Sequence, residues 1–320
     1  MPARRRKKPS VLVIFVLLLN AAGALAILTI FLAYFLQRSA RAAPQPEPAL
    51  TLPLTTTPIP TRYNLPTITP NPRSTEIVVE TPTPFVLMGL APGVIGYSVS
   101  GRPIEVYSFG QGAKQYMIVA GIHGGYEWNT IVLADQLIRY LNVHPEIIPQ
   151  DDTLYILRDL NPDGDARDHG IDGRVNDHGV DLNRNFPINW SATWDRSGCF
   201  DQAATTSGSG PGSEMETHVI MNFLNLHQVQ ALISYHSAAL GIFPGGTPWD
   251  PASVRLAQAI AAVSTYPFPP VETGCVYTGT LADYAVSRGA AAVDMELSDH
   301  EHTEFSMNLK VLNVLLNFKK

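Results

Sequence analysis

The sequence predicts an α/β fold in which a mixed, largely parallel sheet is covered by helices on both faces. Short apolar runs typical of buried strands occur at 116–122, 152–157, 229–235 and 290–297. Segments with apolar residues at helical spacing alternate with them, at 128–141, 213–226, 251–263 and 304–318. Strands that alternate with helices favour a sheet with both faces buried.

Turn and cap signals mark the ends of several elements. Residues 95–109 predict two short strands around a Ser-Gly-Arg-Pro turn, and Asn161–Gly164 is a strong turn signal. Ser213, followed three residues later by Glu216, has the pattern of a capping box and predicts a helix that starts there.

The first 36 residues predict a membrane anchor. Residues 1–10 are a basic cytoplasmic segment, and residues 11–36 carry no charged side chain. A transmembrane helix needs about 20 apolar residues, and the apolar region of a signal peptide is shorter. Cleavage of a signal peptide near Ala40–Ala42 is the alternative. With the basic segment inside, everything after residue 36 faces outward, as in a single-pass protein of the cell membrane.

Residues 37–87 are rich in proline and threonine and predict an extended linker, because proline removes backbone donors. The folded domain is then 88–320, which is long enough to bury one core. The linker is too short and too rich in proline to fold over an active site as a pro-domain.

The charge and the cysteines restrict the possible partners and compartment. The net charge of −6 at pH 7 argues against a nucleic-acid surface. The two cysteines, Cys199 and Cys275, form a disulfide if the domain faces an oxidising compartment. Two free buried thiols are the alternative.

Four polar residues lie at or just beyond the ends of predicted elements: His123, Glu127, His236 and Glu296. Two histidines and one carboxylate suit zinc and leave a fourth position open, as in catalytic sites. A further free glutamate could act as the general base. Each residue also has a structural explanation, such as a polar loop for His123 and Glu127 or a buried ion pair for Glu296.

The segment 180–187, Val-Asp-Leu-Asn-Arg-Asn-Phe-Pro, supplies further candidates. Asn183 and Arg184 offer an amide and a planar guanidinium that suit a terminal carboxylate. Asp181 could hold the second ring nitrogen of His123. Arg184 could instead brace a loop.

In their order along the chain, these motifs resemble the zinc metallocarboxypeptidases of the pancreatic carboxypeptidase type, and most closely their small bacterial members. The resemblance covers about 95–318 and implies a sheet of about eight strands. It implies His123, Glu127 and His236 as ligands of one zinc ion and Glu296 as general base. It also implies that Asn183 and Arg184 bind the substrate carboxylate and that Arg174 polarises the scissile carbonyl, with Arg167 as the competitor.

Two departures from the family pattern are visible. The family spaces its first two ligands His-x-x-Glu, whereas one more residue separates His123 from Glu127. The tyrosine that caps the substrate corresponds best to Tyr277, but its spacing to the next motif is shorter. His300 and His302 form another possible metal pair, for which a solvated loop is the alternative.

The function expected from this sequence is that of a membrane-anchored, outward-facing zinc carboxypeptidase. It would hydrolyse the last peptide bond of peptides with a free C-terminal carboxylate, using zinc-activated water. The lipid bilayer, reached through 11–36, would be its other partner. Ala282, next to Asp283, gives no reason to expect basic specificity. The alternatives are a peptidase for the γ-D-glutamyl-diaminopimelate bond of cell-wall peptides, a catalytically silent binding module, and an amidohydrolase for N-acyl amino acids.

Overall fold

The computed structural model describes residues 91–193, 205–238 and 241–320. The predicted cytoplasmic segment 1–10, transmembrane helix 11–36 and linker 37–87 lie outside the described residues. Within the described part, no helix combines the length and the hydropathy needed to cross a bilayer. The membrane anchor therefore stays a prediction.

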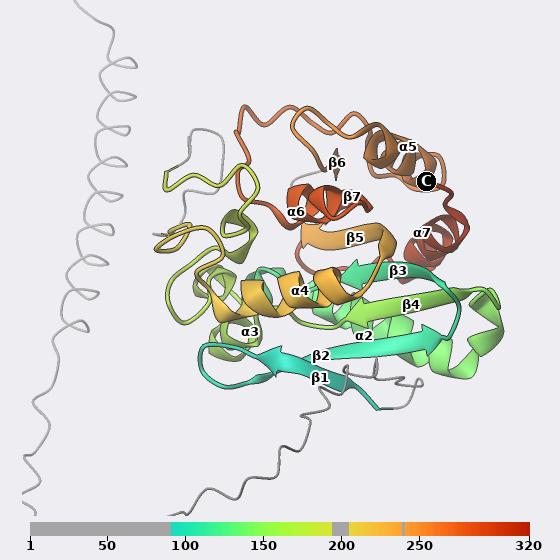
Figure 1. Ribbon diagram of the computed structural model, residues 1–320, viewed down its shortest axis with the longest axis horizontal. Helices are drawn as coiled ribbons and strands as arrows, with labels where there is room; N and C mark the ends of the chain where they lie inside the picture. The colour runs from blue at the N-terminus through green and yellow to red at the C-terminus, as the bar shows by residue number, and fades with distance from the viewer. Residues whose placement is uncertain (1–90, 194–204, 239–240) are drawn as a thin grey trace, which may run out of the picture. The chain divides into compact units, whose positions relative to one another are not determined.

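A mixed sheet with the strand order β1-β2-β4-β3-β5-β7-β6 forms the centre of the described part (Figure 1). The central strands β4, β3, β5 and β7 are parallel, whereas β1, β2 and β6 join at the edges through antiparallel pairs. The bounds are β1 Gly93–Tyr97, β2 Pro103–Gly110, β3 Lys114–Val119, β4 Asp152–Leu157, β5 Val229–Ser237, β6 Ile242–Pro244 and β7 Ala291–Leu297.

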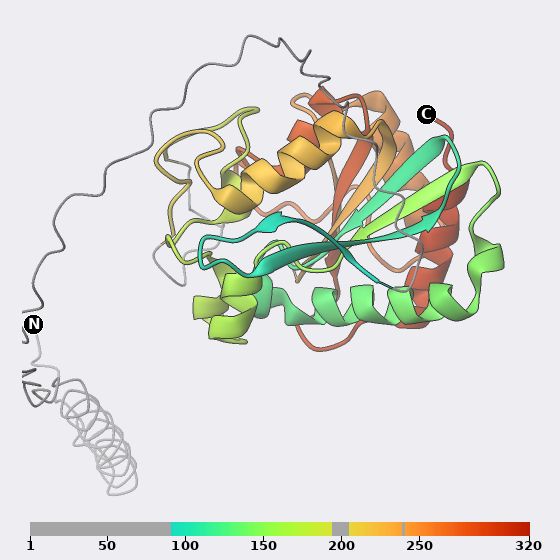
Figure 2. The same cartoon turned by 60° about the horizontal axis from the view of Figure 1, so that its bottom comes forward.

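Helices cover both faces of the sheet. α2 (Trp128–Val143), α5 (Pro251–Ala261) and α7 (Phe305–Asn317) pack on one face, and α4 (Met215–Leu226) and α6 (Leu281–Ser287) on the other. In Figure 2, α4 lies above the sheet and α2 below it. The short helix α3 (Pro162–Arg167) belongs to the loops after β4.

The strand period of two explains why residues 116–119 of β3 are all apolar. Tyr116 and Ile118 point into the core under α2, α5 and α7, while Met117 and Val119 point into the core under α4 and α6. A strand buried on both faces needs apolar residues at consecutive positions, which is the continuous run visible in the sequence.

The α/β class and the main elements agree with the sequence prediction, but two details differ. We expected about eight strands, and the described residues contain seven. Between α5 and α6, residues 264–279 run as a loop without strands, and they include three prolines, Pro267, Pro269 and Pro270, which lack the donor that a ladder needs.

The predicted capping box at Ser213 was also wrong. α4 begins at Met215 with Glu214 as its N-cap and no side-chain cap. The Glu216 carboxylate instead accepts hydrogen bonds from the backbone of Val99 and from Asn176. These tertiary contacts replace the local one.

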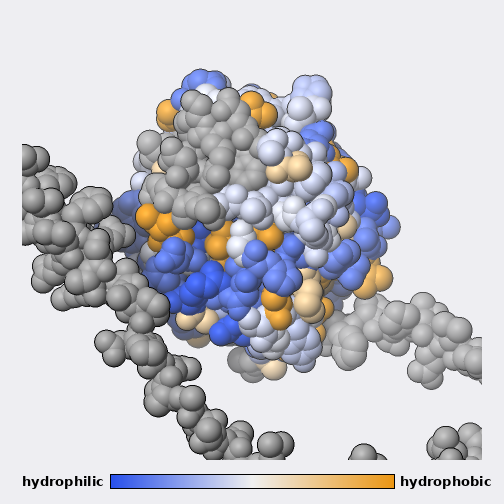
Figure 3. Space-filling view, turned by 90° about the vertical axis from the view of Figure 1, so that its left-hand side faces the viewer, coloured by the Kyte–Doolittle hydropathy of each residue, from blue (hydrophilic) through white to orange (hydrophobic). Residues whose placement is uncertain are grey.

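The carboxyl ends of β3, β5 and β7 lie side by side at one end of the strands, because these strands are parallel. This side of the sheet is called its carboxyl edge below. The side toward which β3 and β4 point in Figure 1 faces the viewer in Figure 3, where strongly hydrophilic residues gather near its centre. Ligands of open α/β sheets bind at such an edge.

We expect Leu137→Ala to lower the free energy of unfolding by about 2–5 kcal/mol, because this α2 side chain is fully buried in the core. Urea denaturation of the purified protein measures the change. The control is Leu226→Ala, at a side chain that is 76% exposed, where the change should stay within about 0.5 kcal/mol. Equal effects of both substitutions would contradict the assignment of the core.

Candidate metal centre and active site

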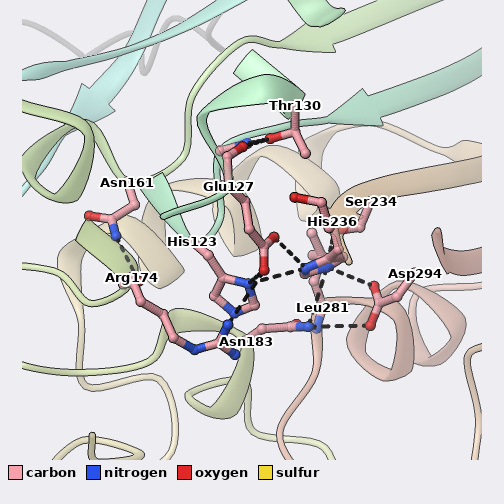
Figure 4. Close-up of polar contacts among 12 residues, drawn as sticks. His123, Glu127, Thr130, Asn161, Arg174, Asn183, Ser234, His236, Leu281 and Asp294 are labelled. Carbon is pink, nitrogen blue, oxygen red and sulfur yellow. Dashed lines mark hydrogen bonds and ion pairs between the residues drawn. The ribbon is translucent and has the colours of Figure 1, made fainter. Parts of the chain in front are cut away.

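Two histidines and one glutamate converge at the carboxyl edge of the sheet. His123 follows β3, Glu127 ends the 3-10 helix η1 (Gly124–Glu127), and His236 lies near the end of β5. All three are buried, and one ligand atom from each lies within 4.8 Å of the others. Figure 4 shows the two imidazoles and the carboxylate directed at one another.

The geometry of the three side chains fits a metal ion. The Nδ1 atom of His123 lies 2.7 Å from Glu127 Oε1, and the Nδ1 atom of His236 lies 3.2 Å from Glu127 Oε2. The two Nδ1 atoms are themselves 3.2 Å apart. Glu127 Oε2 is buried and accepts no hydrogen bond among the described residues. Two imidazoles and an incompletely bonded carboxylate match the ligands that zinc prefers.

The electrostatics favour the ionised form of Glu127. Burial raises the pKa of this carboxyl, but the nearby His123 and His236 rings, together with the hydrogen bond between His123 and Glu127 Oε1, outweigh burial and hold the pKa below its usual range. A carboxylate, rather than a carboxylic acid, is the form that binds a metal.

The extra residue between the two sequence-adjacent ligands is accommodated by η1. The tight turn depends on two glycines: Gly124 has φ of +46°, and a Cβ on Gly125 would lie 2.1 Å from the carbonyl oxygen of Asp168. The turn brings Glu127 back to His123 although three residues, not two, lie between them. It also directs Tyr126 into the cavity that contains the ligands.

Asp181 lies where the sequence suggested, beside His123. Its Oδ1 atom is 3.1 Å from His123 Nε2 and accepts a hydrogen bond from the backbone of Asn183. Its Oδ2 atom accepts two hydrogen bonds from Arg174, at 3.0 and 2.9 Å. Burial raises the pKa of Asp181, but Arg174 and His123 outweigh this effect and keep it well below its usual value.

Of the two candidate arginines, the structure places Arg174 in the site and Arg167 outside it. Arg174 is 6% exposed, and its Nη1 atom lies 3.4 Å from Glu127 Oε1. Arg167 is on the surface, where it binds the carbonyl oxygens of Asp172 and Val175. Only Arg174 can reach a group bound next to Glu127.

Asn183 and Arg184 belong to η4 (Leu182–Arg184) and line the same cavity. Asn183 is fixed by Leu281, whose backbone donates a 2.8 Å hydrogen bond to Asn183 Oδ1. The Arg184 guanidinium lies 5.1 Å from the centre of the Tyr277 ring. Tyr277 is 36% exposed at the rim of the cavity. The three candidate substrate-binding residues are therefore neighbours.

Glu296 lies in β7 and lines the cavity beside the metal ligands. The strand register pairs it with His236 of β5. Sequence reasoning missed Asp294, which lines the cavity as well. Alternation along the strand was the signal, because residues two positions apart face the same side.

The remaining candidates separate into different environments. His300 points toward Ser237, with 3.1 Å between Nδ1 and Oγ, whereas His302 is on the surface beside Asp299. They do not form a second metal pair. Cys275 is disulfide-bonded and lines the cavity, and the only other cysteine of the sequence, Cys199, lies outside the described residues.

The chain was compared with known proteins. A family model described as zinc carboxypeptidase matches residues 91–313. A search of curated protein sequences found no match.

Three solved structures share the fold. Murein-tripeptide amidase from Escherichia coli O157 is 23% identical with a TM-score of 0.53, covering 72% of this chain and 93% of that one. Carboxypeptidase A from Helicoverpa armigera is 23% identical with a TM-score of 0.57, covering 70% and 67%. Bovine thrombin-activatable fibrinolysis inhibitor is 18% identical with a TM-score of 0.55, covering 71% and 88%.

We expect Asp181→Asn to weaken zinc binding by about 10–100-fold, because the amide cannot replace the carboxylate that holds His123 Nε2 and Arg174. Competition with a chromophoric chelator measures the affinity. The control is Asp177→Asn, which removes a surface carboxylate from the same loop region and should leave the affinity unchanged. An unchanged affinity in Asp181→Asn, with the fold intact by circular dichroism, would contradict the role of Asp181.

Proposed function

Because the chain belongs to the zinc carboxypeptidase family, we propose that it hydrolyses the C-terminal bond of peptides and uses one zinc ion. The observation that carries this proposal is one cavity that combines two kinds of group. His123, Glu127 and His236 provide the metal ligands, and Asn183 with Arg184 provides binding groups for a carboxylate.

In this proposal, His123, His236 and the Glu127 carboxylate would hold the zinc ion. The chemistry that zinc supplies in such sites is Lewis acidity, which polarises a carbonyl and makes water a stronger nucleophile at neutral pH. Asp181 contributes indirectly, because its contact with His123 Nε2 fixes the tautomer and the orientation of the ring.

Glu296 acts as the general base. Its position in register with His236 puts it on the edge of the sheet where the scissile bond would lie. The carboxylate takes a proton from the attacking water and gives it to the nitrogen of the leaving residue. Arg174 stabilises the negative charge that develops on the carbonyl oxygen, as a fixed cation in a buried site.

Asn183 and Arg184 recognise the C-terminal end of the peptide substrate. A guanidinium and an amide side by side bind a terminal carboxylate through charge-assisted hydrogen bonds. Tyr277, at the rim over Arg184, covers the bound residue. A peptide without a free carboxylate at this position cannot form the charge-assisted hydrogen bonds with Arg184, so the site favours cleavage at the last bond.

A cell-wall peptide is the second candidate substrate within this chemistry. The fold is shared with the murein-tripeptide amidase from Escherichia coli O157 over 72% of this chain. The γ-D-glutamyl-diaminopimelate bond would also present a free carboxylate to Asn183 and Arg184. A direct comparison of substrates decides between the two.

We expect Glu296→Gln to lower kcat by about 10²–10⁴-fold while zinc content stays at one ion per chain, because the amide cannot accept the proton. The assay uses peptides with a free C-terminus, the same peptides amidated, and a cell-wall tripeptide. The control is Glu301→Gln, at an exposed loop residue, which should keep full activity.

Amidation should abolish hydrolysis in the unsubstituted protein, since it removes the charge that Arg184 binds. Zinc binding without hydrolysis of any substrate would overturn the proposed reaction and favour a binding module. Absence of zinc binding would overturn the metal assignment itself.

We also propose that residues 11–36 tether the catalytic domain to the outer side of the cell membrane, on the strength of their length and lack of charge. The expected result is that the full chain sediments with membranes and resists extraction by high salt. Deletion of 11–36 should release it. Recovery of the full chain in the soluble fraction would contradict the tether.

A further inference from the structure

The carboxylate of Asp294 is a feature of the cavity that the proposed reaction does not use. Asp294 lies in β7 two residues before Glu296, so both side chains face the cavity. The side chain is 13% exposed. Figure 4 shows it on the far side of His236 from Glu127, next to Asn183.

The hydrogen bonding of this carboxylate is incomplete. Asp294 Oδ2 accepts one long hydrogen bond, 3.3 Å, from Asn183 Nδ2. Asp294 Oδ1 is buried and accepts no hydrogen bond among the described residues. A carboxylate can accept about four hydrogen bonds, so most of this capacity is unused.

Asp283, which lines the same cavity, is a carboxylate whose two oxygens both accept hydrogen bonds from the protein. Its Oδ1 atom accepts a 2.7 Å hydrogen bond from the backbone of Gly246. Its Oδ2 atom accepts one from Asn189 Nδ2 at 3.0 Å. Asp283 therefore connects the loop after β6 to α6, whereas Asp294 has only the 3.3 Å hydrogen bond from Asn183 and a 3.6 Å contact with the ring of His236.

The walls of the cavity that Asp294 lines leave room for a side chain. The cavity has a volume of about 590 Å³, and Gly245, Gly246 and Ala282 line it. Ala282 is small, and a glycine contributes no side chain. Phe243 adds an apolar surface to the same lining. A long side chain with an apolar stem and a charged end matches these walls.

We propose that Asp294 is a specificity-determining residue that selects a C-terminal residue whose side chain ends in an ammonium or guanidinium group. The proposal rests on the proposed function, in which Asn183 and Arg184 hold the carboxylate of that residue. The substrate then presents its negative end to Arg184 and its positive end to Asp294. It also revises the expectation from Ala282 alone, which gave no reason to expect basic specificity.

The physical reason is desolvation. An apolar side chain that fills the cavity removes water from Asp294 and leaves the negative charge with only its long contacts to Asn183 and His236, which is costly in a buried site. A cationic side chain of similar length replaces the water with a charge-assisted hydrogen bond. A site built for a polar partner discriminates strongly against an analogue that lacks it, so we expect a preference of at least about 100-fold.

A different role for Asp294 would be to orient His236. Its Oδ1 atom is 3.6 Å from His236 Nε2, which exceeds the length of a hydrogen bond. Ser234 Oγ is closer to the same nitrogen, at 3.1 Å. Loss of an orienting residue would slow all substrates equally, whereas loss of a specificity residue would slow only the cationic ones.

Cationic C-terminal residues have two sources: lysine or arginine at the end of a peptide, and diaminopimelate in a cell-wall peptide. The test therefore uses four substrates with a free C-terminus. Three are acyl dipeptides ending in lysine, arginine or norleucine, and the fourth is a tripeptide ending in diaminopimelate. Norleucine is the uncharged analogue of lysine with nearly the same stem.

For the zinc-loaded full chain, we expect kcat/KM for at least one cationic substrate to exceed that for norleucine by about 100-fold or more. In Asp294→Asn the ratio should fall to within about 5-fold, with the norleucine rate retained, because the amide keeps the shape and loses the charge. The matched control is Glu272→Gln, which removes an exposed carboxylate at the rim, where salt screens the charge and the ratio should persist.

Calorimetry of free L-lysine, L-arginine, diaminopimelate and L-norleucine supplies a readout that does not depend on turnover. Tighter binding of a cationic amino acid, lost in Asp294→Asn but kept in Glu272→Gln, supports the assignment. Equal binding of lysine, arginine, diaminopimelate and norleucine overturns it, as does an equal loss of rate on every substrate in Asp294→Asn.

Failure of this inference and failure of the proposed function have different signatures. A higher kcat/KM for the norleucine substrate than for the cationic substrates would contradict the role of Asp294 but would still support the carboxypeptidase activity. Absence of hydrolysis on all four substrates would contradict the proposed function. The calorimetric comparison would then still decide whether Asp294 selects a cation.

Discussion

The buried carboxylate of Asp181 connects the parts of the site that have to act together. One oxygen contacts His123 Nε2 and the backbone of Asn183, and the other accepts two hydrogen bonds from Arg174. One side chain therefore positions the proposed metal ligand His123, the arginine proposed to stabilise the carbonyl oxygen and the loop proposed to bind the substrate carboxylate. Removing one partner of a buried ion pair costs about 3–5 kcal/mol, because the other charge stays buried without compensation. This constraint explains why the polar residues of the site can be buried at all.

The class of the fold and the positions of the central strands and the main helices could be predicted from the sequence, because these depend on local periodicity, whereas the short edge strand β6 was not predicted. β4 begins at Asp152 and ends at Leu157, as the apolar run indicated, and α2 begins at Trp128. The capping box at Ser213 failed for a reason that no local pattern contains. Glu216 bonds to Val99, which is 117 residues away in the chain.

The candidate site was predictable to the extent that strand ends define it. His123, His236 and Glu296 follow or end apolar runs, so parallel strands bring them to one edge. The geometry of Glu127 was not predictable, since it depends on a 3-10 turn whose Gly125 packs against the carbonyl of Asp168. Asp294 was missed because the sequence does not show which groups a charged residue in an apolar strand will face. That depends on the register of β5 and β7. The pairing of Arg174, rather than Arg167, with Glu127 likewise requires the folded loop.

The charges in the cavity relate the proposed metal, the substrate carboxylate and Asp294 to one another. Glu127, Glu272, Asp283, Asp294 and Glu296 line the cavity and Asp181 contacts His123, whereas Arg174 and Arg184 are the guanidiniums that line it. In the proposed function, a divalent cation would offset part of this excess of negative charge, which a cavity of low dielectric otherwise disfavours. The terminal carboxylate of the proposed peptide substrate would add a further negative charge. A positive side chain on the same residue would offset it, and Asp294 has unused acceptor capacity to receive such a group.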